Sequence, residues 1–228
     1  MGIQYNPSIV TDGLVLCLDA ANKRSYPGTG TVWTDLAEDN DLTLHNSPTF
    51  QTNNGGRFQF DGTDDYGQFS SLDITGGNNY TFMFVVDVRV APTTAYHYIL
   101  DDSNGTTGFG IRLTTQPALQ FFAYDSSGGS AAISTRTASL SLNTIHHLTF
   151  IIRTSYLDSY INAGSKRTDA GIANNIKASS NNMRLGSRSD QVSEMWDGRF
   201  YSASIYNRVL NDEEIRQNYL ATKGRYQL

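Results

Sequence analysis

A stretch of ten residues, TFMFVVDVRV at positions 81–90, places an apolar side chain at every second position. The side chains on this face are Phe82, Phe84, Val86, Val88 and Val90. Successive side chains of an extended chain point to opposite faces, whereas a helix would spread these residues around its axis. The other face mixes polar and apolar residues, with Asp87 and Arg89 beside Met83. The stretch therefore predicts a strand that turns one face to a core, and Pro92 ends it.

Shorter strand patterns surround this stretch, separated by turn residues roughly every 8–12 positions. They cover 13–20, 96–100, 109–113, 119–124, 145–153, 157–162, 183–186 and 200–206. Aromatic residues make up 11% and charged residues 17% of the chain, and 20 residues are glycine, a composition that favours strands joined by polar turns. All-β sandwiches of 228 residues fold as one unit. We therefore predict an all-β sandwich that forms a single domain over 1–228, with an N-terminal arm at 1–12.

The segment RFQFDGTDDYGQF at 57–69 predicts a reversal between two strands, because an Asp-Gly pair separates two aromatic runs. We favour a structural hairpin in which the carboxylates of Asp61, Asp64 and Asp65 are turn formers in water. In the alternative interpretation the same carboxylates hold a calcium ion, which prefers several oxygen ligands from flexible loops. Their spacing differs from the calcium loop of helix–loop–helix proteins. We therefore assign no metal and no other cofactor.

Only the C-terminus is expected to be helical, over about 211–224. Asn211 is the expected N-cap, Glu214 completes a capping box, and acidic residues fill the first turn. Gly224 is expected just past the end of the helix. Such a short helix is not stable alone, so it must pack on the sheets. The residues expected to pack are Ile215, Tyr219 and Leu220.

Charge and hydropathy patterning exclude several classes of function. The net charge is −5 and no basic run occurs, which excludes nucleic acid as a partner. No apolar run approaches the roughly 20 residues of a membrane helix, so no membrane insertion is expected. The first residues lack the basic segment and apolar core of a secretion signal, so we expect a soluble protein made in a cytosol. Cys17 lies in an apolar run and is expected to be buried.

The residues that most often carry catalysis do not form a recognisable set. His146 and His147 are neighbours on an expected strand, so they face opposite ways and cannot share a metal. We expect one of them in the core and one at the surface. No Gly-x-Ser-x-Gly elbow, zinc motif or phosphate loop occurs. The sequence therefore indicates a protein without enzymatic activity.

Sugar binding is harder to exclude than catalysis. It takes aromatic faces and nearby planar polar groups, offered by loops on a rigid scaffold. The loops that follow 96–100 and 119–124 carry both kinds of group. The candidate ligand-binding residues are Tyr96, Tyr98, Asp101, Asp102, Asn104, Tyr124 and Asp125. We favour the interpretation in which the tyrosines pack internally and the carboxylates shape turns, and keep these residues as the candidate rim of a sugar site.

Several pieces of the chain occur in an order that resembles a known family. They are Phe60–Gly62, Asp64–Tyr66, Tyr80–Val90, Ile145–Thr149, Leu157–Asn162, Arg184–Gly186 and Gly198–Ile215. The chain is similar to the laminin-G-like branch of the concanavalin A-like lectin/glucanase superfamily. The resemblance implies a jelly-roll sandwich of two antiparallel sheets. The hydrolases of that superfamily carry Glu-x-Asp-x-x-Glu on one strand, and none of the four glutamates here fits that pattern. This supports the expectation of no enzymatic activity.

The two ends of the chain, at 5–28 and 221–226, are similar to standalone laminin-G-like proteins encoded by tailed bacteriophages. That resemblance implies a virion structural protein, a head decoration or a tail or fibre component, that acts by adhesion. The expected partners are other virion proteins, further copies of the chain on the particle and a host-surface glycan. Its location would be the virion, assembled in the host cytoplasm. The alternatives are a dedicated lectin for host-surface polysaccharide and, less favoured, a glycosidase.

Overall fold

The structure is a computed structural model. It describes residues 7–70, 72, 74, 79–93, 96–124, 132–153, 156–170, 176–177, 179, 182–189 and 194–228, with the side chains of 132–138 left out.

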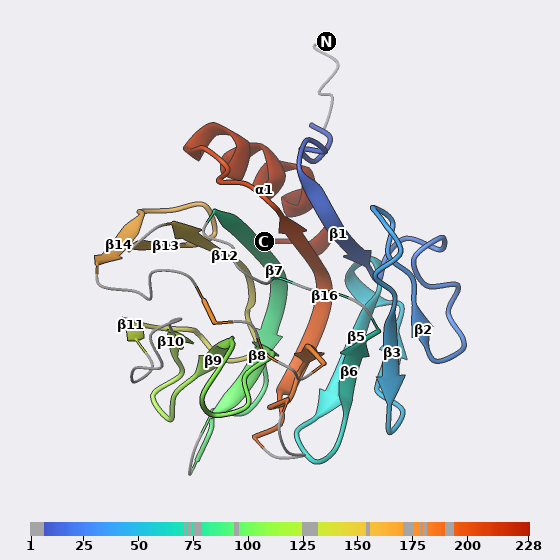
Figure 1. Cartoon of the computed structure of the whole chain (residues 1–228). Coiled ribbons are helices and arrows are strands. Elements are labelled where there is room, and N and C mark those ends of the chain that lie inside the picture. Colours follow the sequence, from blue (N-terminus) through green and yellow to red (C-terminus); the bar gives the residue numbers. More distant parts are fainter. Residues whose placement is uncertain are drawn as a thin grey trace.

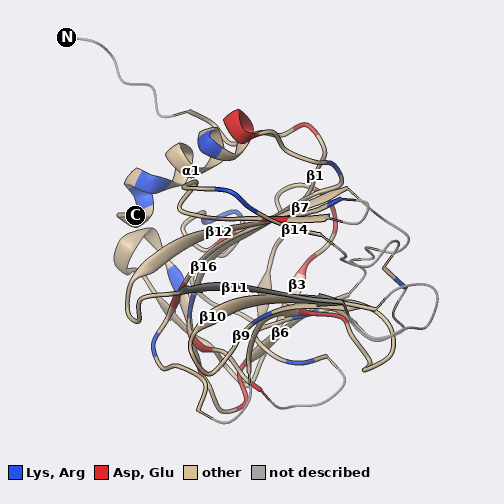
Figure 2. Ribbon diagram, turned by 90° about the vertical axis from the view of Figure 1, so that its left-hand side faces the viewer, with Lys and Arg blue, Asp and Glu red and all other residues tan. Residues whose placement is uncertain are grey.

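Two antiparallel eight-stranded sheets lie face to face (Figures 1 and 2). In spatial order the first sheet holds β14 (Arg167–Ala170), β13 (Tyr156–Ile161), β12 (Ile145–Arg153), β7 (Tyr80–Val88), β16 (Asp197–Tyr206), β5 (Arg57–Asp61) and β4 (Thr49–Gln51), with β1 (Leu14–Asp19) also paired to β16. The second sheet holds β11 (Ala132–Ser139), β10 (Ala118–Ala123), β9 (Phe109–Leu113), β8 (His97–Asp101), β15 (Arg184–Leu185), β6 (Tyr66–Phe69), β3 (Leu42–His45) and β2 (Val32–Trp33). The predicted all-β jelly-roll sandwich is confirmed.

The hydrophobic core lies between the sheets. Phe82 on β7 is fully buried, and its ring centroid lies 5.3 Å from that of Phe109 on β9, which joins the two sheets. The opposite face of β7 is buried as well, with Met83 4% and Val85 2% exposed. The sequence predicts burial of one face only. The second face is buried because a helix packs on the outside of this sheet, which periodicity within β7 cannot reveal.

The segment at 57–69 forms the two expected strands, but they do not pair with each other. β5 pairs with β16 and β4, whereas β6 pairs with β3 and β15. The predicted hairpin is therefore wrong. The Asp-Gly turn carries the chain from one sheet to the other, and Gly62 takes the left-handed conformation there with φ 76°.

Helix α1 (Asp212–Tyr226) lies on the outer side of the first sheet (Figure 2). The predicted capping box is confirmed. The Asn211 side chain accepts hydrogen bonds from the backbone N–H groups of Glu213 and Glu214, and the Glu214 side chain accepts one from the Asn211 N–H. Ile215 is 1% exposed and packs on the sheet as expected. Among the described residues, no helix has the length and apolar character needed to cross a membrane.

Two predicted details of this helix are wrong. The helix continues through Gly224 to Tyr226, because Tyr226 is fully buried and packs edge-on against Tyr201 at 5.4 Å between ring centroids. Leu220 is 36% exposed, and the buried position in that turn belongs to Asn218.

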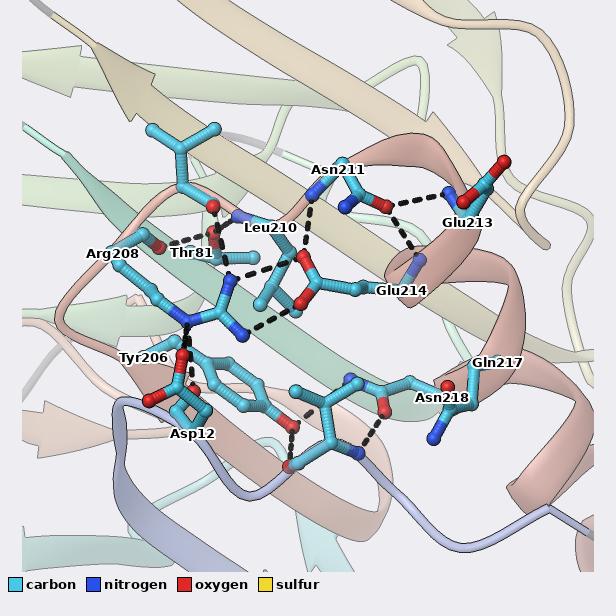
Figure 3. Close-up of polar contacts among 12 residues, drawn as sticks. Asp12, Thr81, Tyr206, Arg208, Leu210, Asn211, Glu213, Glu214, Gln217 and Asn218 are labelled. Carbon is cyan, nitrogen blue, oxygen red and sulfur yellow. Dashed lines mark hydrogen bonds and ion pairs between the residues drawn. The ribbon is translucent and has the colours of Figure 1, made fainter.

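Residues 7–12 lie against α1 and the end of β16, and the polar contacts that hold them are drawn in Figure 3. The Val10 N–H donates to Asn218 Oδ1 at 2.8 Å. Asn218 Nδ2 donates to the Tyr206 hydroxyl at 2.9 Å, and that hydroxyl donates to the Val10 carbonyl at 2.9 Å. This closed ring of three hydrogen bonds joins the Val10 backbone to the buried side chains of Tyr206 and Asn218. The N-terminal arm is therefore docked from residue 7 onward, and residues 1–6 lie outside the described part of the chain.

Candidate functional site

Three predicted tyrosines meet on the outer face of the second sheet, where β8, β9 and β10 lie side by side. Tyr96 precedes β8, Tyr98 lies on β8, and Tyr124 follows β10. Tyr98 on β8 pairs with Arg112 on β9, and Arg112 pairs with Gln120 on β10. Paired residues in register point to the same face of a sheet. Their neighbours Ile111 and Phe121 point the other way and belong to the core. Tyr98, Arg112 and Gln120 therefore form a row across three strands on the side away from the core.

Arg112 is the centre of this row. Its Nη1 donates to the Tyr98 hydroxyl at 2.7 Å, and its Nε donates to Gln120 Oε1 at 2.6 Å. Its guanidinium carbon lies 3.5 Å from the ring centroid of Tyr96 and 4.4 Å from that of Phe122, both within cation–π distance. Burial raises the pKa of Tyr98, so its hydroxyl keeps its proton. These contacts hold the guanidinium in one orientation.

A hollow of about 140 Å³ opens beside Arg112. It is lined by Tyr96, Tyr98, Ser103, Arg112, Phe122, Tyr124, Arg188 and Glu194. Tyr96 and Tyr124 are partly exposed at its rim, whereas Tyr98 is 1% exposed and forms its floor. Arg188 and Glu194 form an ion pair at 3.6 Å. Aromatic faces with a few fixed polar groups are typical of sites for small organic ligands and sugars.

Residues 61–216 match the family described as the concanavalin A-like lectin/glucanases superfamily. The chain belongs to this superfamily. The match covers more than half of the chain and confirms the resemblance read from the sequence, although it does not reach the finer, phage-encoded type.

Solved structures with a similar fold include two proteins of known source. Trypanosoma rangeli sialidase in complex with sialic acid superposes with a TM-score of 0.67 at 15% identity, over 93% of this chain and 33% of that one. The botulinum neurotoxin serotype D binding domain superposes with a TM-score of 0.67 at 14% identity, over 92% of this chain and 52% of that one. This concanavalin A-like chain thus spans about a third and a half of their lengths. A search of the curated proteins gives no match.

The described polar candidates of this concanavalin A-like chain have structural partners, within their own loop for Asp102 and Asn104 and in the segment after β15 for Asp101. Asp101 is fully buried, Asp102 is nearly so, and Asn104 lies just beyond them. Each accepts a hydrogen bond from a backbone N–H. The donors are those of Ser189 (2.8 Å), Phe109 (2.7 Å) and Thr107 (2.9 Å), respectively. These contacts favour the interpretation in which the three side chains shape turns. Asp125 lies outside the described residues.

Five lining residues are absent from the sequence-based prediction: Ser103, Arg112, Phe122, Arg188 and Glu194. Arg112 and Phe122 alternate with core residues of their strands, and that alternation alone would have placed both on an outer face. No local signal in the sequence places them beside Tyr96.

The acidic turn at 61–65 brings three carboxylates together, with ligand oxygens within 4.8 Å of one another. Asp61 Oδ1 accepts hydrogen bonds from the Thr63 and Asp64 N–H groups at 2.8 and 3.4 Å, and Asp65 Oδ2 accepts one from the Asp61 N–H at 3.1 Å. Burial, with the negative charges of Asp61 and Asp64 nearby, raises the pKa of Asp65 to about 6. The hydrogen bonds are those of turn formers, as the favoured interpretation holds. The prediction that all three carboxylates lie in water is wrong, because Asp65 is 5% exposed.

The two adjacent histidines face opposite sides of β12, but the prediction that one is exposed is wrong. His146 is 6% and His147 2% exposed. His146 Nε2 lies 3.1 Å from the Ser141 carbonyl oxygen, and the His147 ring lies edge-on to Tyr219 of α1 at 5.7 Å. Burial lowers both pKa values, that of His147 to about 4. The helix covers the face on which exposure was expected.

A second hollow, of about 230 Å³, lies between the docked N-terminal segment, β1, β16 and α1. Cys17 and Arg225 are among the residues that line it. It shares no residue with the hollow beside Arg112.

Proposed function

We propose that the chain is a non-catalytic carbohydrate-binding module whose ligand lies in the hollow beside Arg112. The observation that carries this proposal is the immobilised guanidinium between the rings of Tyr96 and Phe122, with Tyr124 at the rim. A sugar ring stacks its apolar face on an aromatic side chain, while its hydroxyl groups need fixed donors and acceptors nearby. The hollow offers both without rearrangement of the strands.

The comparisons support this proposal at the level of the fold. One similar structure is a sialidase with bound sialic acid, and another is the binding domain of a toxin. The same fold thus occurs in a sialidase that was solved with bound sialic acid and in a toxin domain that is named for binding. The chemistry of the proposed site comes from the residues of this chain.

The absence of catalysis is part of the proposal. Glycoside hydrolysis generally takes two carboxyl groups that flank the scissile bond. Glu194 is the one carboxylate among the described lining residues, and it is paired with Arg188. Turnover of any glycan by the purified protein would overturn this part.

The test is a glycan array probed with the wild type and with Tyr96→Ala and Tyr124→Ala. Each variant removes a rim ring without touching the core, and we expect apparent affinity to fall at least about tenfold. Tyr156→Ala is the matched control, because Tyr156 is a 47% exposed tyrosine on β13 of the other sheet. An equal loss in the control, or no glycan bound by the wild type, would overturn the proposal.

The setting that we propose for this module is the virion of a tailed bacteriophage, as an adhesive head, tail or fibre component in several copies. The support is the resemblance of the two chain ends at 5–28 and 221–226, which meet where the Tyr226 hydroxyl donates to Asp19 Oδ1 at 2.9 Å. Purified particles should contain the protein at a fixed stoichiometry. Its absence from particles, with glycan binding intact, would favour the dedicated lectin instead.

A further inference from the structure

Two arginines on the outer face of the second sheet are held by uncharged groups. The partners of Arg112 are the hydroxyl and the amide described above. Arg184 on β15 donates from Nε to Gln68 Oε1 and from Nη1 to the Arg188 carbonyl oxygen, both at 3.3 Å. Within the described part of the chain, neither arginine forms an ion pair with a carboxylate.

Both arginines lie against a tyrosine. The guanidinium carbon of Arg184 is 4.6 Å from the ring centroid of Tyr66, which stacks in turn on His45 at 4.5 Å with an interplanar angle of 8°. Arg112 has the same relation to Tyr96 at 3.5 Å. In each case hydrogen bonds to described residues occupy Nε and Nη1, and Nη2 has no such bond. Each arginine therefore has donor capacity left for a ligand.

Two partly buried arginines near the first sheet are neutralised by carboxylates. Arg199 pairs with Asp87 at 2.8 Å, and Arg208 pairs with Glu214 at 2.7 Å. On the second sheet Asp101 is the residue opposite Arg184, but its carboxylate accepts hydrogen bonds from serine side chains and forms no ion pair with that arginine in the described structure. Arg112 and Arg184 thus differ from these two in forming no ion pair with a described carboxylate, a property that they share with Arg57 of β5.

We infer that this face of the second sheet selects acidic glycans, whose carboxylates bind Arg112 and Arg184. The inference rests on the proposed function and narrows its ligand class. A guanidinium recognises a carboxylate through charge-assisted hydrogen bonds that a neutral sugar cannot supply. Strands β9 and β15 flank β8, and Arg184 is level with Gly110, two residues from Arg112, so the two arginines are about 12 Å apart. This separation favours a glycan that carries a carboxylate on more than one sugar.

The experiment compares an oligogalacturonate with its methyl ester by isothermal titration, next to an array of sialylated, uronate-containing and neutral glycans. The ester keeps the shape of the acid and removes its charge. We expect the acid to bind at least about tenfold more tightly than the ester, and more weakly as salt increases. Arg184→Gln should weaken acid binding and leave ester binding little changed, because Arg184 does not line the hollow beside Arg112. Arg112→Gln should weaken acid binding more than ester binding. Arg216→Gln is the matched control, because Arg216 is an exposed arginine of α1.

The outcomes separate this inference from the proposed function. Equal binding of acid and ester, array binding confined to neutral glycans, or acid binding that neither Arg112→Gln nor Arg184→Gln weakens would overturn the inference and leave the proposed function standing. No binding of any glycan would overturn both. Because Arg112→Gln also removes a partner of Tyr98, thermal unfolding of each variant is measured first, and Arg184→Gln provides the second, independent variant.

Discussion

At the scale of single residues, burial shifts the acid–base equilibria of side chains that line the hollows and loops. Cys17 has its pKa raised to about 11 by burial and by the nearby charges of Asp19 and Asp35. The pKa of Asp65 is raised to about 6, and that of His147 is lowered to about 4. The common cause is that a charged side chain loses hydration in the interior, so its neutral form is favoured.

The Cys17 thiol should be almost unreactive in the native protein. With a pKa of about 11, only about a thousandth of it is thiolate at pH 8, and the side chain is 8% exposed. Treatment with iodoacetamide at pH 8 should leave the native chain largely unmodified, while the same treatment in urea should add one carbamidomethyl group by intact mass. Native labelling as fast as denatured labelling would contradict this expectation.

The raised pKa of Asp65 predicts a pH dependence of stability. Between about pH 4, where the unfolded chain releases this proton, and about pH 6, where the folded one does, the folded state binds more protons, so stability falls as pH rises. Asp65→Asn stays neutral and can still accept the Asp61 N–H. Its gain in unfolding free energy over the wild type should therefore be larger at pH 7 than at pH 4, measured by urea denaturation.

The control for this prediction is Asp39→Asn, a change at an exposed loop aspartate that should leave the pH dependence as it is in the wild type. A gain for Asp65→Asn that is the same at both pH values would show that the ionisation of Asp65 does not destabilise the fold.

How far single residues could be predicted is clearest at the hollow beside Arg112. The sequence points to Tyr96, Tyr98 and Tyr124, and the structure places all three there. Arg112 could not be singled out, because its role comes from Gln120 on the next strand and from Tyr98 on the strand before. Which strands adjoin is a property of the whole sheet, and no local pattern encodes it.

At the scale of elements, the capped helix is the best-predicted part of the chain. Asn211→Ala removes a side chain that accepts two backbone hydrogen bonds, so the unfolding free energy should fall by about 1 kcal/mol. For a chain of this size that corresponds to a decrease in Tm of about 2–4 °C in thermal unfolding. Glu213→Gln keeps both capping bonds and is the matched control. An unchanged Tm in Asn211→Ala would contradict the role assigned to the cap.

Whether the sequence predicts a strand depends on how strongly apolar residues alternate within it. Strongly alternating ones such as β7 and β12 lie where the sequence predicts them. The sequence does not predict β11 and β14, because their residues AISTRTAS and RTDA are mostly polar and form edge strands. The Asp-Gly turn between β5 and β6 is correct as a turn, but a turn signal does not state which sheet the next strand joins.

At the scale of the whole molecule, the two outer faces of the sandwich are unlike. Helix α1 and the docked N-terminal segment cover the first sheet, so that Met83, Val85 and Ile151 are buried on its outer side. Near the hollow on the second sheet, Tyr96 and Tyr124 stay partly exposed. The covered face and the proposed ligand face thus lie on different sheets.

The most direct test of that division is an NMR titration of the isotope-labelled protein with the glycan that binds most tightly on the array. We expect the Nε–H signal of Arg112 and the backbone amide signals of β8, β9 and β10 to shift in proportion to occupancy, while those of α1 stay in place. Shifts confined to α1 and the hollow at Cys17, or to the acidic turn at Asp61–Asp65, would contradict the account.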